Sequence, residues 1–217
     1  MKKNIAKMLF ITILTVSALS CKDKAKEATT TAAEAVENVV NAEKYTVNSE
    51  TSTIEWAGYK PTGSHNGTIA IENGILDVTN GKIVGGSFII NMDSITVLDI
   101  PADDKGNAKL VGHLKSADFF DVEKHANAAF TITGVEEVEG KTMLSGNLLL
   151  KETKNNVTFP VTVTNANGTI TLASETFTID RTKWNIEYKS KSIFKSIGDK
   201  FINDDMELKV TVKATRS

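Results

Sequence analysis

The sequence predicts an all-β domain of antiparallel strands, and two observations indicate this fold class. Apolar and polar residues alternate in several segments, most clearly over residues 157–164 and 206–213. A period of two places every second side chain on the same face of a strand, so each strand is predicted to bury one face. The dipeptide Asn-Gly begins at positions 66, 73, 80 and 167 and suits the type I′ turns that join antiparallel neighbours. Such a sheet protects its edges by packing on a second sheet or by closing into a barrel.

Along the chain, residues 1–20 come first and are predicted to be a secretory signal peptide. Three lysines precede an apolar run at residues 8–19, and small residues follow it. The run is shorter than the roughly 20 residues that a membrane-spanning helix needs, so it is expected to direct export. Without these three lysines the net charge of −2 becomes more negative. A negatively charged mature protein has no electrostatic attraction for nucleic acid.

Cys21 is the only cysteine of the chain and follows the predicted signal peptide directly. A single cysteine cannot form an internal disulfide. Residues 17–20, Ser-Ala-Leu-Ser, resemble the small residues that precede the lipidated cysteine of bacterial lipoproteins, although Ala18 stands where leucine is commoner. We therefore expect lipidation at Cys21. Each buried acyl CH₂ contributes about 0.8 kcal/mol, so the acyl chains would anchor the exported protein to a membrane of the bacterial cell envelope, facing the periplasm or the cell surface.

Residues 21–44 are predicted to be the lipidated cysteine and a flexible tether, because this segment is rich in alanine, threonine and charged residues and has no aromatic residue. Its small apolar residues also recur at three- and four-residue steps, which leaves a weakly amphipathic helix as an alternative: Ala25, Ala28, Ala32, Val36 and Val39. Residues 45–217 are predicted to form a single domain. Within it, only residues 101–116 have apolar side chains at helical steps, so one short helix is expected.

The sequence lacks the usual patterns of a reactive site. The three histidines, His65, His113 and His125, are too far apart in the chain for zinc-ligand spacing. No Gly-x-Ser-x-Gly motif and no glycine-rich phosphate loop is present. We therefore predict no catalytic residue, no metal and no cofactor.

The stretch from His113 to Val122, HLKSADFFDV, resembles the signature of the YceI-like family of bacterial lipid- and polyisoprenoid-binding proteins. Further matches follow the family order along the chain: Ile54-Glu55-Trp56, His65-Asn66-Gly67, Phe159-Pro160, Ile179 to Trp184, and Asp205 to Ala214. Glu152 and His125-Ala126 depart from the family pattern near predicted turns. The resemblance implies a lipocalin-like, extended antiparallel β-barrel of about eight strands. It also implies that the interior binds the tail of an isoprenoid or another long-chain amphiphile.

On this interpretation the ligand site is the set of inward-facing apolar residues on three strands: Val84, Phe88, Ile90, Met92, Leu144, Leu148, Leu150, Val157, Phe159 and Val161. The alternative for each of them is a place in a dry, filled core. A second set is expected to cap one end of the barrel or to meet the head group: His65, His113, Phe119, Phe120, Arg181 and Trp184. For His113 a hydrogen bond to the backbone is preferred over contact with a head group, and for Arg181 a structural pair with a carboxylate is preferred over contact with an anionic head group.

Three functions remain open at this point. The first is a lipid-anchored carrier or sequestering protein whose partners are an isoprenoid-like lipid and the membrane. The second is an exported enzyme that uses His65, His113 and Asp180 on a small substrate. The third is a non-binding envelope scaffold with a solid core. The preferred hypothesis is the carrier, which is not an enzyme and needs no group other than the bound lipid.

Overall fold

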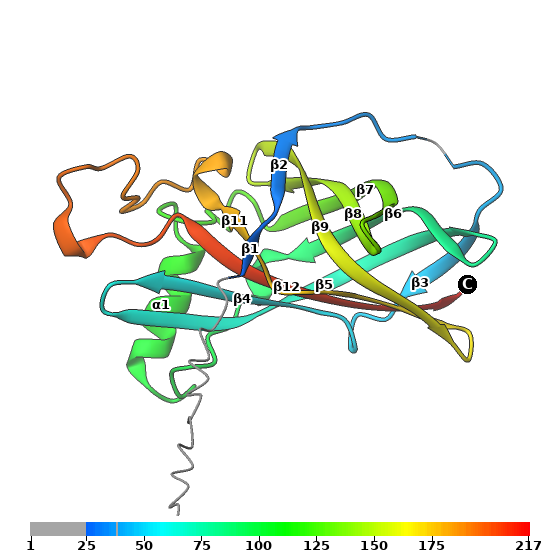
Figure 1. The fold of residues 1–217 in the computed structure, drawn as a ribbon. Coiled ribbons are helices and arrows are strands. Elements are labelled where there is room, and N and C mark those ends of the chain that lie inside the picture. The colour runs from blue at the N-terminus through cyan, green and yellow to red at the C-terminus, as the bar shows by residue number, and fades with distance from the viewer. Residues whose placement is uncertain (1–24, 38) are drawn as a thin grey trace, which may run out of the picture.

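The computed structural model describes residues 25–37 and 39–217, which form one antiparallel β-barrel with a helix at one end (Figure 1). The predicted signal peptide and the predicted lipidation site, Cys21, lie outside the described residues. Within those ranges no helix is both long and apolar enough to cross a bilayer. The predicted all-β fold class is confirmed.

Eight strands close into a ring in which each strand pairs antiparallel with the next and the last strand returns to the first. These strands are β4 (Thr53–Lys60), β5 (Gly63–Thr79), β6 (Lys82–Asn91), β7 (Asn127–Val138), β8 (Lys141–Leu150), β9 (Thr153–Ala166), β10 (Thr169–Ser174) and β12 (Asp205–Arg216). A shorter strand, β3 (Glu43–Val47), continues the path of β4 between β5 and β12. Likewise, β11 (Phe177–Asp180) continues the path of β10 along β12.

Two of the four Asn-Gly dipeptides form hairpin turns. Asn80 and Gly81 have φ of 51° and 74°, and Asn167 and Gly168 have φ of 53° and 76°. Positive φ at both central residues is what a type I′ turn requires. The other two dipeptides lie inside β5 and are not turns. Gly67 is needed there because a Cβ atom at this position would lie 1.8 Å from the carbonyl oxygen of Thr96.

A β-bulge in β6 reverses the side-chain alternation and places Val84 on the outside of the barrel. Val78 pairs with Ile83, whereas the preceding residue Asp77 pairs with Gly85, so Val84 has no partner on β5. Val84 is 39% exposed, although Ile83 and Phe88 on the same strand are buried. The prediction that Val84 faces inward is therefore wrong, because one extra residue exchanges the two faces of a strand.

The helix α1 (Lys105–Lys115) lies within the range predicted from the sequence. Its N-cap is Asp104, whose side chain accepts a hydrogen bond of 2.6 Å from the backbone N–H of Gly106. Leu114 is buried, and Leu110 and Val111 pack against the barrel core. The helix and the 3₁₀ turn η1 (Met92–Ser94) lie in the connection between β6 and β7, so they cover one end of the barrel (Figure 1). We call this end the α1 end.

The N-terminal segment completes the barrel wall near the α1 end. Residues of β9 and β11 are not paired with each other, and two short strands occupy the space between them. The first, β1 (Lys26–Glu27), pairs parallel with β11, and the second, β2 (Thr29–Ala32), pairs antiparallel with β9. The prediction of a flexible tether is therefore wrong for these residues. Threonine favours strands, and the exposed edges of β9 and β11 offer unpaired backbone groups, so strand pairing is the stable arrangement.

Side chains on the outer face of the barrel hold the continuation of this segment. The side-chain amide of Asn147 donates to the carbonyl oxygen of Glu34 (2.7 Å), and the backbone N–H of Glu34 donates to Asn147 Oδ1 (2.9 Å). Asn156 in turn donates to Asn147 Oδ1 (3.2 Å). Both asparagines are buried although they lie on the outside of the strand ring. We call residues 25–37 the N-terminal strap.

Candidate functional site

A narrow cavity of about 370 Å³ runs inside the barrel. Side chains from all eight strands of the ring and from α1 line it, and most of them are apolar. Four successive inward residues of β12 line its length: Met206, Leu208, Val210 and Val212. With a rise of about 3.3 Å per residue, these positions span about 20 Å along the strand. The cavity is therefore long relative to its volume, a shape that suits an extended chain rather than a compact molecule.

Most residues of the predicted ligand site line this cavity, namely Phe88, Ile90, Met92, Leu144, Leu148, Leu150, Val157 and Phe159. Val161 is buried but does not reach the cavity, and Val84 faces outward. A group of aromatic rings forms part of the wall. Phe159 stacks on Phe177 with ring centroids 4.2 Å apart, and Phe130 lies 6.0 Å from Phe159. The sequence analysis missed Phe130 and Phe177, although Phe130 lies two residues from each of the buried residues Ala128 and Ile132 on β7.

At the α1 end, three aromatic rings border the cavity. The ring of His113 lies 5.0 Å from that of Phe119 and 4.9 Å from that of Tyr188. His113 Nε2 is 2.9 Å from a carboxylate oxygen of Asp118, so the predicted hydrogen bond from its side chain to the backbone is wrong. Phe119 and Phe120 are both buried and both line the cavity, as expected for side chains that close this end.

His65 also lines the cavity and is paired with a carboxylate. Its Nδ1 lies 2.8 Å from Asp99 Oδ2, and the backbone N–H of Asn66 donates to Asp99 Oδ1 (2.9 Å). Burial acts to raise the pKa of Asp99, but the hydrogen bonds from Asn66 and His65 outweigh it and hold this pKa below its ordinary value. Asp99 therefore keeps its negative charge beside His65.

Tyr59 is a further polar group of the lining that the sequence analysis did not select. Its hydroxyl donates to Glu207 Oε2 (2.7 Å), and this hydrogen bond together with burial raises the pKa of Tyr59 to about 12. Tyr59 therefore stays neutral at physiological pH. Its position next to Gly58 on β4 places it close to the α1 end of the cavity.

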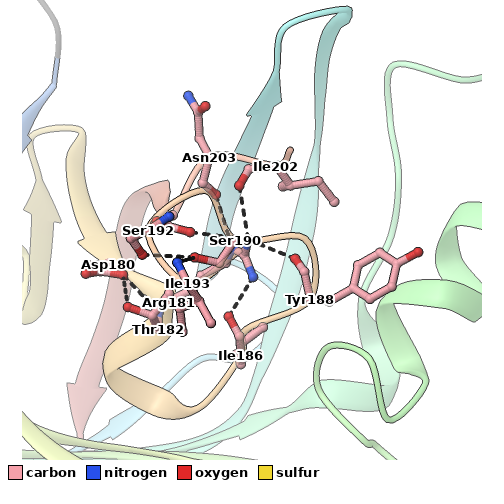
Figure 2. A network of polar contacts seen from close by, with 11 residues as sticks. Asp180, Arg181, Thr182, Ile186, Tyr188, Ser190, Ser192, Ile193, Ile202 and Asn203 are labelled. Carbon is pink, nitrogen blue, oxygen red and sulfur yellow. Dashed lines mark hydrogen bonds and ion pairs between the residues drawn. The ribbon is translucent and has the colours of Figure 1, made fainter. Parts of the chain in front are cut away.

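Arg181 lines the cavity, and its guanidinium organises the loop beside it (Figure 2). It lies in η2 (Arg181–Trp184) and is 1% exposed. Its guanidinium donates to four carbonyl oxygens, those of Ile186, Tyr188, Ile202 and Asn203, at 2.5–3.1 Å. Burial lowers its pKa, and the charges of Asp204 (3.5 Å) and Asp180 oppose this effect.

These four carbonyl groups belong to residues 185–204, which connect η2 to β12 and include η3 (Gly198–Lys200); we call this segment the mouth loop. Arg181 ties both ends of the mouth loop to the barrel. Of the two predicted roles, the structural one fits its contacts, with backbone carbonyl groups as the main partners. Trp184 is fully buried and donates to the carbonyl oxygen of Leu148 (3.1 Å), so it too supports the barrel wall and does not line the cavity.

The charged residues that line the cavity are basic. Lys60, Lys189 and Lys200 line it at the α1 end, and none of its lining residues within the described chain is an aspartate or glutamate. Of these lysines, Lys60 and Lys200 are exposed. An opening with basic charges over an apolar interior can hold an amphiphile, with its tail removed from water and its head group at the lysines.

Of the three residues of the enzyme hypothesis, His65 and His113 line the cavity and Asp180 does not. His65 and His113 are each paired with a carboxylate. Asp180 accepts hydrogen bonds from the backbone N–H and the hydroxyl of Thr182 at 2.9 and 2.7 Å, which caps η2, and it does not line the cavity. The described part of the chain also contains no group of three or more histidine, cysteine, aspartate or glutamate residues that could hold a metal ion.

A family model described as the YceI-like domain matches residues 45–214. The chain belongs to the YceI-like family. Among solved structures, Burkholderia cenocepacia BcnA is similar to it with a TM-score of 0.60 at 20% identity, covering 78% of this chain and 99% of BcnA. A polyisoprenoid-binding domain from Saccharophagus degradans, implicated in plant cell wall breakdown, has a TM-score of 0.56 at 11% identity and covers 80% of this chain and 98% of that domain. No curated protein matches the sequence.

These identities are low, so the two solved structures bear on the fold alone. They agree with the closed ring of eight antiparallel strands, and the predicted lipocalin-like barrel is confirmed.

Proposed function

We propose that this YceI-like protein binds a long-chain amphiphile, with an isoprenoid or similar apolar tail inside the barrel, as a carrier or sequestering protein. The observation that carries the proposal is the apolar cavity of about 370 Å³ that extends along the barrel interior. Its volume lies within the range of roughly 300–1,000 Å³ that is typical of ligand pockets. Membership of a family of binding proteins supports the proposal, as does the structural similarity to a domain described as polyisoprenoid-binding.

The physical chemistry of such a site requires no reactive group. Removal of apolar surface from water contributes about 25 cal/mol per Å², so an enclosed tail is held by burial alone. Lys60, Lys189 and Lys200 at the α1 end favour a polar or anionic head group that remains close to solvent. The contacts of His65, His113 and Asp180 give the enzyme hypothesis no comparable support.

The proposed location is the bacterial cell envelope. Export by the predicted signal peptide and lipidation of Cys21 would hold the barrel beside a membrane, which is where long-chain amphiphiles are found. No cofactor other than the bound lipid enters the proposal.

The decisive experiment is mass spectrometry of residues 22–217, exported to a bacterial periplasm and purified without detergent. This segment keeps every residue that the structure describes. We expect a long-chain amphiphile in about one copy per protein. A protein that is folded but repeatedly empty, and that does not take up an added isoprenoid quinone, would contradict the proposal.

Two glycine substitutions sharpen this test. Gly58 lines the cavity, and a Cβ atom there meets nothing within 4 Å, so Gly58→Phe would place a ring in the cavity without a backbone clash. Gly134 is equally open, but it pairs with Ser145, whose neighbour Leu144 faces inward, so Gly134→Phe places the same ring outside. We expect Gly58→Phe to lose the lipid and Gly134→Phe to keep it, with both variants folded by circular dichroism. Lipid retention by a folded Gly58→Phe would place the ligand elsewhere.

A further inference from the structure

The tip of the mouth loop is both apolar and basic. Ile193 and Phe194 are 42% and 48% exposed, and among the described residues they are the only two large exposed apolar residues that are adjacent in the chain. Four lysines surround them in sequence: Lys189, Lys191, Lys195 and Lys200. Asp199 is the only acidic residue between positions 189 and 200.

The charges of these lysines are not neutralised by acidic side chains of the described chain. None of the four lysines forms an ion pair with a carboxylate of the described chain. Lys189 and Lys191 instead lie over the rings of Tyr188 and Phe201, at 5.2 and 4.7 Å from the ring centroids. Exposed apolar residues that lie together on a surface usually mark an interaction site.

The backbone beneath this tip is nevertheless fixed. The backbone N–H of Phe194 donates to the carbonyl oxygen of Ser190 (2.9 Å), and that of Ile193 donates to the hydroxyl of Ser190 (3.3 Å). The backbone N–H of Ser192 donates to the carboxylate of Asp204, which in turn lies 3.5 Å from the guanidinium of Arg181. A loop that is already ordered loses little conformational entropy when it binds a partner.

The tip lies next to the opening of the cavity. Lys189, Lys200 and Ile202 of the mouth loop all line the cavity. In Figure 1 the loop, drawn in orange, extends beyond the strands at the α1 end, on the opposite side of the molecule from the hairpin turns at residues 80–81 and 167–168. Whatever binds the tip therefore faces the cavity opening.

We propose that the mouth loop docks on the surface of an anionic phospholipid bilayer. Ile193 and Phe194 enter the region between head groups and acyl chains, and the four lysines contact the anionic head groups. This combination of an apolar pair with surrounding lysines is the chemistry of interfacial membrane binding. The inference goes beyond the proposed function, since docking depends on the tip alone and does not require an occupied cavity.

The first test places a tryptophan at the tip. In residues 22–217, Phe194→Trp is mixed with vesicles of phosphatidylcholine containing phosphatidylglycerol, with and without bromine on the acyl chains. We expect its emission to shift to shorter wavelength and to be quenched by the brominated chains, with neither effect on pure phosphatidylcholine. Val138→Trp, which is exposed at the end of β7 away from α1, is the control and should not respond. Emission that stays unchanged at Phe194→Trp would overturn the proposal.

The second test measures the charges. An anionic surface attracts each nearby lysine by roughly 1 kcal/mol, which is about fivefold in affinity, so Lys191→Ser with Lys195→Ser should weaken vesicle binding about 25-fold. Lys82→Ser with Lys141→Ser gives the same net charge at the other end of the barrel and should leave binding unchanged. An equal loss in the two double variants would mean non-specific attraction and would refute docking by this loop. Cavity occupancy, read separately by mass spectrometry, keeps this outcome distinct from failure of the proposed function.

Discussion

Replacing Arg181 by methionine should destabilise the mouth loop before the barrel. The substitution keeps much of the apolar stem but removes the guanidinium that donates to four carbonyl groups. The carbonyl oxygen of Ile186 is buried with no access to water, and leaving such a group unpaired costs about 1–3 kcal/mol. Removing one partner of a buried charged network, while the other partners stay buried, costs about 3–5 kcal/mol in total.

That loss is a large part of the 5–15 kcal/mol by which a typical domain is stable, yet it leaves most molecules folded. The assay is urea unfolding combined with hydrogen exchange of backbone amides. Unfolding should shift to lower urea concentration, and amides of residues 185–204 should lose protection while those of β8 keep it. Lys183→Met is the matched control: Lys183 lies in the same turn and is 3.5 Å from Glu27 in an exposed pair, which is worth less than about 1 kcal/mol. A loss below about 1 kcal/mol in Arg181→Met, or equal loss of protection in β8, would refute the reasoning.

Two further predictions concern the wall and the lining of the barrel. Asn147→Ala removes both hydrogen bonds to Glu34, at a cost of about 1–3 kcal/mol. The N-terminal strap should then lose amide protection and become sensitive to protease near Glu34. An unchanged digestion pattern would mean that Asn147 does not hold the strap. Because the folded pKa of Tyr59 is raised to about 12 by Glu207, its hydrogen bond stabilises the fold fully below pH 10 and is lost as pH rises from about 10 towards 12. Stability curves over this range should fall less steeply for Tyr59→Phe than for the wild type.

Local sequence patterns predicted most of the barrel. The alternating runs predicted β9 and β12, and the helical steps predicted α1, because each pattern reports on neighbours two to four residues away. Eight of the ten predicted interior residues line the cavity for the same reason. The prediction for Val84 was wrong because a single unpaired residue in β6 exchanges the inner and outer faces of the strand. That bulge depends on how β6 pairs with β5, which a local pattern does not report.

The roles of the N-terminal strap and of Arg181 could not be predicted from local patterns. The strap pairs with strands more than 120 residues away, and its threonines have no apolar period that would distinguish a strand from a tether. The sequence analysis expected Arg181 to interact with a carboxylate or with a ligand head group. Its main partners are instead backbone carbonyl groups. Carbonyl groups are present at every residue, so no sequence signal identifies those that meet a given side chain.

The strap changes what a lipid at Cys21 would do. A flexible tether of residues 21–44 would let the barrel adopt any orientation above a membrane. Because strand pairing begins at Lys26, only the residues between Cys21 and Ala25 could act as a tether, and four residues reach at most about 14 Å. An anchor that short would hold the wall between β9 and β11 close to the bilayer. Since β11 leads through η2 directly into the mouth loop, the proposed anchor and the proposed docking tip would restrain neighbouring parts of the barrel, and together they would direct the cavity opening towards the membrane.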